Sequence, residues 1–135
     1  VEIAELAGAE NIYTFGKDSE SIIKLYETAG YVSKEYYEND KDIKRAVDFI
    51  LNPAVVKLGN KTRLERLYNE LLNKDWFMTL IDFNAYVEAK EQILADYEDQ
   101  DSWNEKVVHN IAKAGFFSSD RTIAQYNAEI WHCEG

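Results

Sequence analysis

Cysteine, proline and methionine are scarce in this sequence, with one of each in 135 residues. The single cysteine, Cys133, excludes an internal disulfide. A chain without disulfides is typical of a reducing compartment, and we expect the protein to be cytoplasmic.

Long apolar runs are also missing. The longest stretches fall far short of the roughly 20 apolar residues of a membrane-spanning helix, so we expect no membrane partner. The first residues show no charged-then-apolar leader. The sequence starts at Val1 rather than at a methionine, which predicts a processed chain or a piece of a longer protein.

Positive charge is the third deficit. Lysine and arginine number 15 against 25 acidic residues, giving a formal net charge of −10. This balance argues against nonspecific binding to nucleic acid or to an anionic membrane. The six glycines, at positions 8, 16, 30, 59, 115 and 135, form neither a P-loop nor a dinucleotide-binding fingerprint.

The sequence does contain enough apolar material for the core of one ordinary domain, with 46% hydrophobic and 13% aromatic residues. Helical periodicity predicts about seven helical segments, at 1–8, 18–30, 33–51 with a break near 39–40, 60–72, 82–97, 102–115 and 118–132. Expected helix starts are Asp18 or Ser19, Asp82, a capping box at Ser102–Glu105, and Ser118–Asp120; expected stops are Gly8, Gly30, Pro53 and Gly115.

Two short stretches have the composition of strands. Ile12–Phe15 is β-branched and aromatic, and Trp76–Ile81 is a continuous apolar run of strand length. A run that is apolar on both faces is typical of a strand covered on both sides in a parallel sheet. We therefore predict an α/β fold with two short strands, the last of a larger parallel sheet whose other strands lie upstream of Val1.

No local pattern predicts an active site or a metal centre. Glu105 and His109 lie one helical turn apart, a spacing that acid–base pairs and metal ligands share. We favour an exposed histidine there, because no second His or Cys joins the pair. His132 and Cys133 are adjacent, near the end of the sequence, and we expect neither a metal site nor a catalytic pair from them.

Acidic and aromatic clusters are the remaining candidates for chemistry. The carboxylates at Asp40 and Asp42, and at Glu98, Asp99 and Asp101, lack calcium-loop spacing and are interpreted as solvated faces. Tyrosines at helical spacing could form a sugar-stacking surface, although core packing is the favoured interpretation; they are Tyr26, Tyr31, Tyr36, Tyr37, Tyr68, Tyr86 and Tyr97.

The most specific string runs from Gly115 to Trp131. Gly115 is expected to end a helix in the left-handed conformation, and a residue of Ser118–Asp120 to cap the next helix. That helix carries an apolar stripe, called here the C-terminal stripe, made of Ile123, Tyr126, Ile130 and Trp131. Nothing on the stripe is a nucleophile or a metal ligand, which indicates packing.

Three blocks of the sequence resemble the C-terminal end of the α-glucan phosphorylases, the family of glycogen, starch and maltodextrin phosphorylases. The blocks are Val1–Gly8 through Gly16, Asp82–Val87, and Asn110–Ala112 through Trp131. The resemblance implies a parent enzyme that transfers a terminal glucosyl unit from an α-1,4-glucan to inorganic phosphate, giving glucose 1-phosphate. It also implies a pyridoxal phosphate cofactor, whose phosphate serves in acid–base work, and a homodimer.

The same resemblance assigns residues 1–135 to a single unit, the closing portion of a C-terminal Rossmann-like domain. The final helix, 118–132, is expected to pack toward the missing N-terminal domain. In this family the cofactor lysine and the substrate-binding residues precede Val1, and no lysine here, Lys17 and Lys24 included, lies in the cofactor motif. We therefore expect no catalytic, cofactor-binding or metal-binding residue, no bound cofactor, and no activity of this chain alone.

Two alternatives remain open. One is a free-standing acidic helical module that binds a protein partner through an exposed apolar patch. The other is a related two-domain glycosyltransferase such as a glycogen synthase, which would lack the final block.

Overall fold

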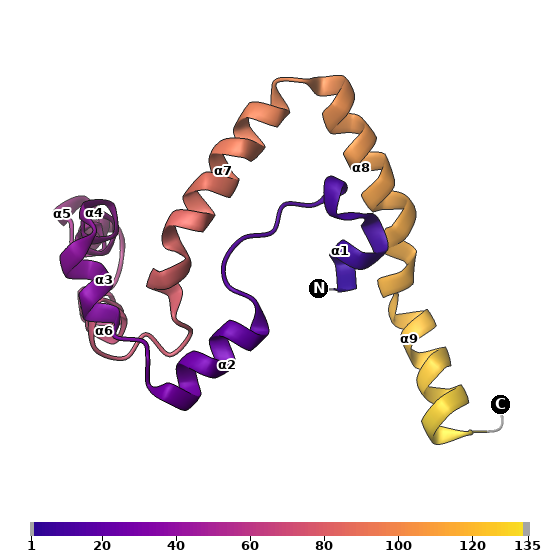
Figure 1. Cartoon of the computed structure of the whole chain (residues 1–135), viewed down its shortest axis with the longest axis horizontal. Helices are drawn as coiled ribbons and strands as arrows, with labels where there is room; N and C mark the ends of the chain where they lie inside the picture. The colour runs from indigo at the N-terminus through magenta and orange to yellow at the C-terminus, as the bar shows by residue number, and fades with distance from the viewer. Residues whose placement is uncertain (1, 134–135) are drawn as a thin grey trace. The chain divides into compact units, whose positions relative to one another are not determined.

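Helices are the only regular secondary structure that the computed structural model shows in the residues it describes, 2–133 (Figure 1). In chain order the α-helices are α1 (Glu2–Ala7), α2 (Ser19–Thr28), α3 (Ser33–Asn39), α4 (Lys41–Phe49), α5 (Pro53–Leu58), α6 (Lys61–Asn73), α7 (Phe83–Tyr97), α8 (Gln100–Ala114) and α9 (Ser119–Tyr126). Shorter turns are the 3₁₀ helices η1 (Ala9–Asn11), η2 (Thr79–Asp82) and η3 (Gly115–Phe117) and the π-helical turn η4 (Asn127–Trp131).

The chain folds into two compact units. One unit contains the chain up to Thr14 together with the chain from Glu91 onward, and the other contains Phe15–Lys90. Within residues 2–133, none of the helices has both the length and the apolar character needed to cross a bilayer.

The predicted α/β fold is wrong, because the described residues contain neither predicted strand. Ile12 has extended backbone angles of φ −141° and ψ 146°, but Ile12–Phe15 pairs with no neighbouring segment. A strand needs such a partner for its N–H and C=O groups. In Trp76–Ile81 the backbone of Met78 turns left-handed, with φ 51°, and η2 follows at once. This apolar run is therefore a turn and a 3₁₀ helix.

Most predicted helices are confirmed, and their caps show why they form. Asp18 accepts a hydrogen bond from the Ser21 N–H at 2.7 Å, and Ser118 accepts one from the Arg121 N–H at 3.3 Å. The expected break near 39–40 is the point where Asp40 ends α3 and caps α4. The number of α-helices rises from the predicted seven to nine within residues 2–133, because of this break and because α5 begins at Pro53.

Several end signals were misread. Asp99, not Ser102, caps α8, and the Ser102 N–H donates to its carboxylate at 3.2 Å. The left-handed residue that closes α2 is Ala29 rather than the following glycine, with φ 49°. Gly115 has an ordinary helical φ of −56° and continues into η3. Asp82 is the last residue of η2, and its carboxylate accepts the Lys17 N–H at 3.0 Å.

The core of the Phe15–Lys90 unit is a small cluster in which Ile43 and Val47 of α4 meet Leu80 of η2. These side chains are 2%, 3% and 4% exposed. Partly buried side chains from α3, α6 and α7 pack against the cluster; they are Tyr36, Tyr37, Tyr68, Leu72 and Phe83. The core is therefore small for a unit of this length, and aromatic rings supply much of it.

The tyrosines divide between core and surface. Core packing is confirmed for Tyr36, Tyr37 and Tyr68. It is wrong for Tyr26, Tyr86 and Tyr97, whose side chains are 56%, 48% and 51% exposed; periodicity alone does not identify which helix face is covered.

Asp75 fixes the turn between α6 and η2. This residue is 5% exposed and has a left-handed φ of 35°. Its carboxylate accepts the Tyr31 hydroxyl at 2.5 Å and the Leu80 N–H at 3.0 Å, so the buried oxygen is paired. Burial and this carboxylate raise the pKa of Tyr31 well above its usual range. Trp76 and Phe77, at the tip of the turn, stay 65% and 91% exposed.

Truncating the core tests this arrangement. We expect Ile43→Ala to lower the free energy of unfolding by about 2–5 kcal/mol, because it leaves a cavity beside Leu80. Ile23→Ala is the matched control, since the Ile23 side chain is 56% exposed, and it should change stability by less than about 1 kcal/mol. Urea unfolding followed by circular dichroism measures both. Equal losses in the two variants would contradict the assigned core.

Candidate functional site

The structure assigns ordinary structural roles to the acidic candidates. Asp40 and Asp99 cap helices, and Asp42 pairs with Arg45 at 3.0 Å. Residues 2–133 contain no group of three or more His, Cys, Asp or Glu side chains arranged to hold a metal ion. Glu98 and Asp101 therefore join no metal-binding group in that part of the chain.

The histidine candidates lie on exposed surfaces. Glu105 and His109 share a shallow hollow on α8 with Val108, which is 64% exposed. The backbone N–H groups of His132 and Cys133 donate to Asn127, at 2.7 Å to its carbonyl and 2.8 Å to its side-chain oxygen. These contacts close the last helical turn and account for the His132–Cys133 pair without catalysis.

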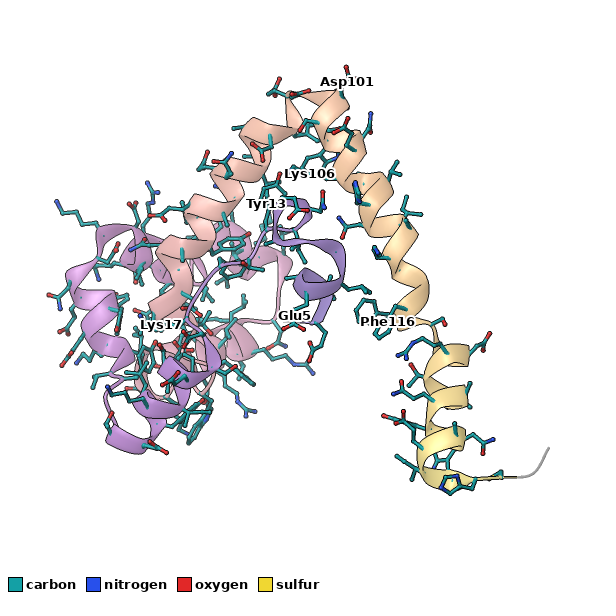
Figure 2. The ribbon with its side chains drawn as sticks, turned by 45° about the vertical axis from the view of Figure 1, so that its right-hand side comes forward. Glu5, Tyr13, Lys17, Asp101, Lys106 and Phe116 are labelled. Carbon is teal, nitrogen blue, oxygen red and sulfur yellow. The ribbon has the colours of Figure 1, made fainter. Side chains whose placement is uncertain are left out.

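An aromatic groove lies in the unit that contains α8. It has a volume of about 460 Å³, and its wall includes Tyr13, Trp103, Lys106, Asn110 and Ile93. Tyr13 and Lys106 come from sequence positions far apart and lie close together in Figure 2. Sequence reasoning missed this groove, because no local spacing links Tyr13 to a helix some ninety residues later.

Hydrogen bonds hold the wall of the aromatic groove in place. The Asn110 amide donates to the Asn11 carbonyl at 2.7 Å, and the Lys106 ammonium donates to the Glu10 carbonyl. The Tyr13 ring stacks on Trp103 with a centroid separation of 6.3 Å, and Lys106 lies 5.7 Å from the centre of the Tyr13 ring. The polar groups of this groove are thus already engaged with the protein itself.

Tyr13 and Asp96 form the main charged contact beside the groove. The Tyr13 hydroxyl donates to the Asp96 carboxylate at 2.6 Å. Burial and the neighbouring carboxylate raise the pKa of Tyr13 to about 12, and the hydrogen bonds from Tyr13 and Gln92 lower the pKa of Asp96. Tyr13 and Lys106 are therefore both held by hydrogen bonds within the protein.

A second hollow lies in the Phe15–Lys90 unit, between α3 and the start of α7. Its volume is about 410 Å³, and it is lined by both polar and apolar side chains. The Asn84 amide donates to the Asp40 carboxylate at 2.8 Å. That hydrogen bond, with those from the N–H groups of Ile43 and Asp42, lowers the pKa of Asp40.

The C-terminal stripe is largely exposed. Ile123, Tyr126, Ile130 and Trp131 are 54%, 45%, 63% and 51% exposed, and the rings of Tyr126 and Trp131 meet edge to face at 5.5 Å. The Arg121 guanidinium donates to the Phe116 carbonyl and lies 3.9 Å from the centre of the Phe116 ring.

The Tyr13–Asp96 contact predicts a pH dependence. The contact stabilises neutral Tyr13. Its contribution to the free energy of unfolding is therefore complete below about pH 10 and is lost as the pH rises through about 12. Asp96→Asn removes the charge, and we expect the Tyr13 pKa to fall while remaining above the free value, because burial persists. NMR of the Tyr13 ring carbon bonded to oxygen measures this shift. Asp101→Asn, in the neighbouring helix α8, is the control and should leave the Tyr13 pKa unchanged. An unchanged Tyr13 pKa in Asp96→Asn would show that the Asp96 carboxylate does not raise it.

Comparison with known proteins identifies the relatives of this chain. A family model described as carbohydrate phosphorylase matches residues 1–133. The chain is 65% identical to the maltodextrin phosphorylase of Streptococcus pneumoniae, over 98% of this chain and 17% of that protein. It is 39% identical to the glycogen phosphorylase of Bacillus subtilis and 38% identical to the brain form of glycogen phosphorylase of Homo sapiens, over 97% and 99% of this chain and 16% of each relative. The chain belongs to the carbohydrate phosphorylase family, confirming the resemblance of its sequence blocks.

Proposed function

We propose that this chain is part of an α-1,4-glucan phosphorylase, the kind of enzyme that its sequence blocks predict. The carrying observation is the 65% identity to a maltodextrin phosphorylase across 98% of the chain. In the proposed reaction the bond between C1 of the terminal glucose and O4 of the next glucose breaks. A phosphate oxygen bonds to C1, and O4 receives a proton, giving glucose 1-phosphate and a shortened glucan.

The surface of the chain supports a place within a larger protein. In residues 2–133, the buried hydrophobic residues are Ala7, Ile43, Val47, Met78 and Leu80, and exposed large hydrophobic side chains outnumber them several-fold. Large exposed apolar patches mark interfaces. Since the chain spans 17% of the S. pneumoniae relative, we propose that the rest of the enzyme covers part of this surface.

The C-terminal stripe is the proposed docking surface, and its partner is the N-terminal half of the same enzyme. The four stripe residues are hydrophobic and about half exposed, and the Ser118 cap fixes where their helix begins. We propose the homodimer and the cytoplasmic location for the whole enzyme, with glucan and phosphate as its substrates.

Pyridoxal phosphate is the proposed cofactor of the whole enzyme, but the residues of this chain do not fit it. Enzymes carry this cofactor on a lysine, together with groups that hold its phosphate. All lysines of the chain are exposed except Lys106, which is half-buried and occupied by the Glu10 carbonyl. We therefore propose that the cofactor and the catalytic residues lie outside this chain, which is inactive alone.

Activity of the whole protein tests the proposal. We expect the full-length protein to release glucose 1-phosphate from maltoheptaose and phosphate. The reason is the 65% identity, over 98% of this chain, to a maltodextrin phosphorylase, since maltoheptaose is a maltodextrin. A coupled assay for glucose 1-phosphate measures it, with the 1–135 chain plus pyridoxal phosphate as the inactive control. No product from the full-length protein would contradict the proposed activity. Stoichiometric cofactor binding by the 1–135 chain would contradict the proposal that the cofactor lies outside this chain.

Docking by the C-terminal stripe is tested separately. Ile130→Asp should destabilise the full-length protein by more than about 1 kcal/mol, because it places a carboxylate in a covered apolar contact. In the 1–135 chain the same change should cost little, since Ile130 is 63% exposed there. Ile23→Asp, at 56% exposed, is the matched control. Thermal unfolding of each variant in both proteins measures the change in stability. A similarly small loss of stability for Ile130→Asp in the full-length protein and in the 1–135 chain would contradict docking.

A further inference from the structure

The hollow between α3 and the start of α7 has the dimensions and wall of a small-molecule site. Its volume of about 410 Å³ falls within the roughly 300–1,000 Å³ of ligand pockets. Two buried core residues, Ile43 at 2% exposed and Leu80 at 4%, contribute its apolar base. All of its lining residues belong to the Phe15–Lys90 unit, so the site is complete within one compact unit.

The rim of this hollow is polar and partly fixed in advance. Asp40 is held by the N–H groups of Asp42 and Ile43, at 2.8 and 3.1 Å, and it receives the Asn84 amide at 2.8 Å. That bond uses the Asn84 amide nitrogen and leaves the side-chain oxygen of Asn84 without a hydrogen bond in residues 2–133. A preorganised amide at the edge of a hollow loses little entropy when it binds a ligand.

Further hydrogen-bonding capacity lines the same hollow. Glu35 and Asn39 are exposed, and their side chains make no hydrogen bond within residues 2–133. Tyr36 is half-buried, and its ring lies against Tyr31 at 5.2 Å. Together these groups offer carboxylate and amide acceptors, amide donors and one phenol, around a base that is apolar.

The chemistry of the wall selects one class of ligand. Anions such as phosphate are disfavoured, because Glu35 and Asp40 are acidic and the lining contains no lysine or arginine. A metal ion is disfavoured, since no group of three His, Cys, Asp or Glu side chains suited to hold one occurs in residues 2–133. A purely apolar ligand would strip water from the polar rim without pairing it. A neutral molecule with many hydroxyl groups and apolar C–H faces satisfies both the rim and the base.

We propose that this hollow binds glucosyl units of an α-1,4-glucan, with Glu35, Asn39 and Asn84 accepting or donating hydrogen bonds to sugar hydroxyls and Tyr36 contributing its phenol. The assignment of the sugar as an α-glucan rests on the proposed phosphorylase function. The binding chemistry itself rests on the wall of the hollow.

Paired variants of the full-length protein test the proposal. The double variant Glu35→Ala/Asn39→Ala removes two groups of the rim, and Glu38→Ala/Asn69→Ala is the matched control. Glu38 pairs with Lys34 on the same helix, and Asn69 donates to its own helix, so neither lines the hollow. We expect the double variant to bind glycogen about tenfold more weakly than the wild type in native gels containing glycogen. The control should match the wild type.

A second variant keeps the test independent of folding. Tyr36→Phe retains the ring that packs against the core and removes the hydroxyl, so a weaker glycogen interaction without lower thermal stability would support the site. Unchanged glycogen retardation in both Tyr36→Phe and the double variant would overturn it. Gel retardation needs no turnover, so a wild-type protein that binds glycogen but makes no glucose 1-phosphate would contradict the proposed function and leave this binding site standing.

Discussion

Within residues 2–133 this chain has more large apolar side chains than its small core can bury. The Phe15–Lys90 unit centres on Ile43, Val47 and Leu80, while whole apolar faces, the C-terminal stripe among them, stay exposed. A self-contained domain of this composition would cover such faces, because burial of apolar area is the main favourable term in folding. The exposed faces, the 17% coverage of the S. pneumoniae relative and the lack of a fitting cofactor lysine support the same proposal, a structural part of a larger enzyme.

Carboxylates do much of the positioning that a larger core would otherwise provide. Asp40 joins α3, α4 and α7 through backbone N–H groups and the Asn84 amide. Asp75, itself buried, fixes the turn between α6 and η2 through Tyr31, and Asp96 fixes Tyr13 beside the aromatic groove. Each carboxylate has at least two donors, which offsets the cost of removing it from water. Part of the acidity of the sequence therefore serves structure as well as solubility.

Local signals in the sequence predicted the helices better than the long-range contacts. Asp18, Asp40 and Ser118 act within three residues of themselves, and their caps were predictable from residue type and spacing. Ile12–Phe15 and Trp76–Ile81 have the composition of strands, but a strand requires a partner edge that no local pattern reports. The left-handed Met78, which breaks the second run, carries no sequence signal of the kind a glycine gives.

The concave surfaces were beyond sequence reasoning for the same reason. Tyr13 meets Asp96 and Trp103, and Asp40 meets Asn84, across separations that no helical or strand period connects. The tyrosines also show the limit of periodicity. Tyr36 and Tyr86 both lie at helical spacing from apolar neighbours, but Tyr36 packs against the core and Tyr86 is half exposed. Family membership, in contrast, followed from short blocks, since Gly115–Trp131 is specific as a string even though its residues are a cap and a stripe.

Hydrogen–deuterium exchange across α9 and η4 tests the central claim most directly, by comparing the full-length protein with the 1–135 chain. If the rest of the enzyme covers the C-terminal stripe, the backbone amides of Thr122–Trp131 should exchange at least about 100-fold more slowly in the full-length protein, because docking suppresses local opening of this helix. The amides of α4, which packs on the core within its own unit, should change much less. Equal exchange of Thr122–Trp131 in the two proteins would contradict the claim that this chain is completed by the enzyme around it.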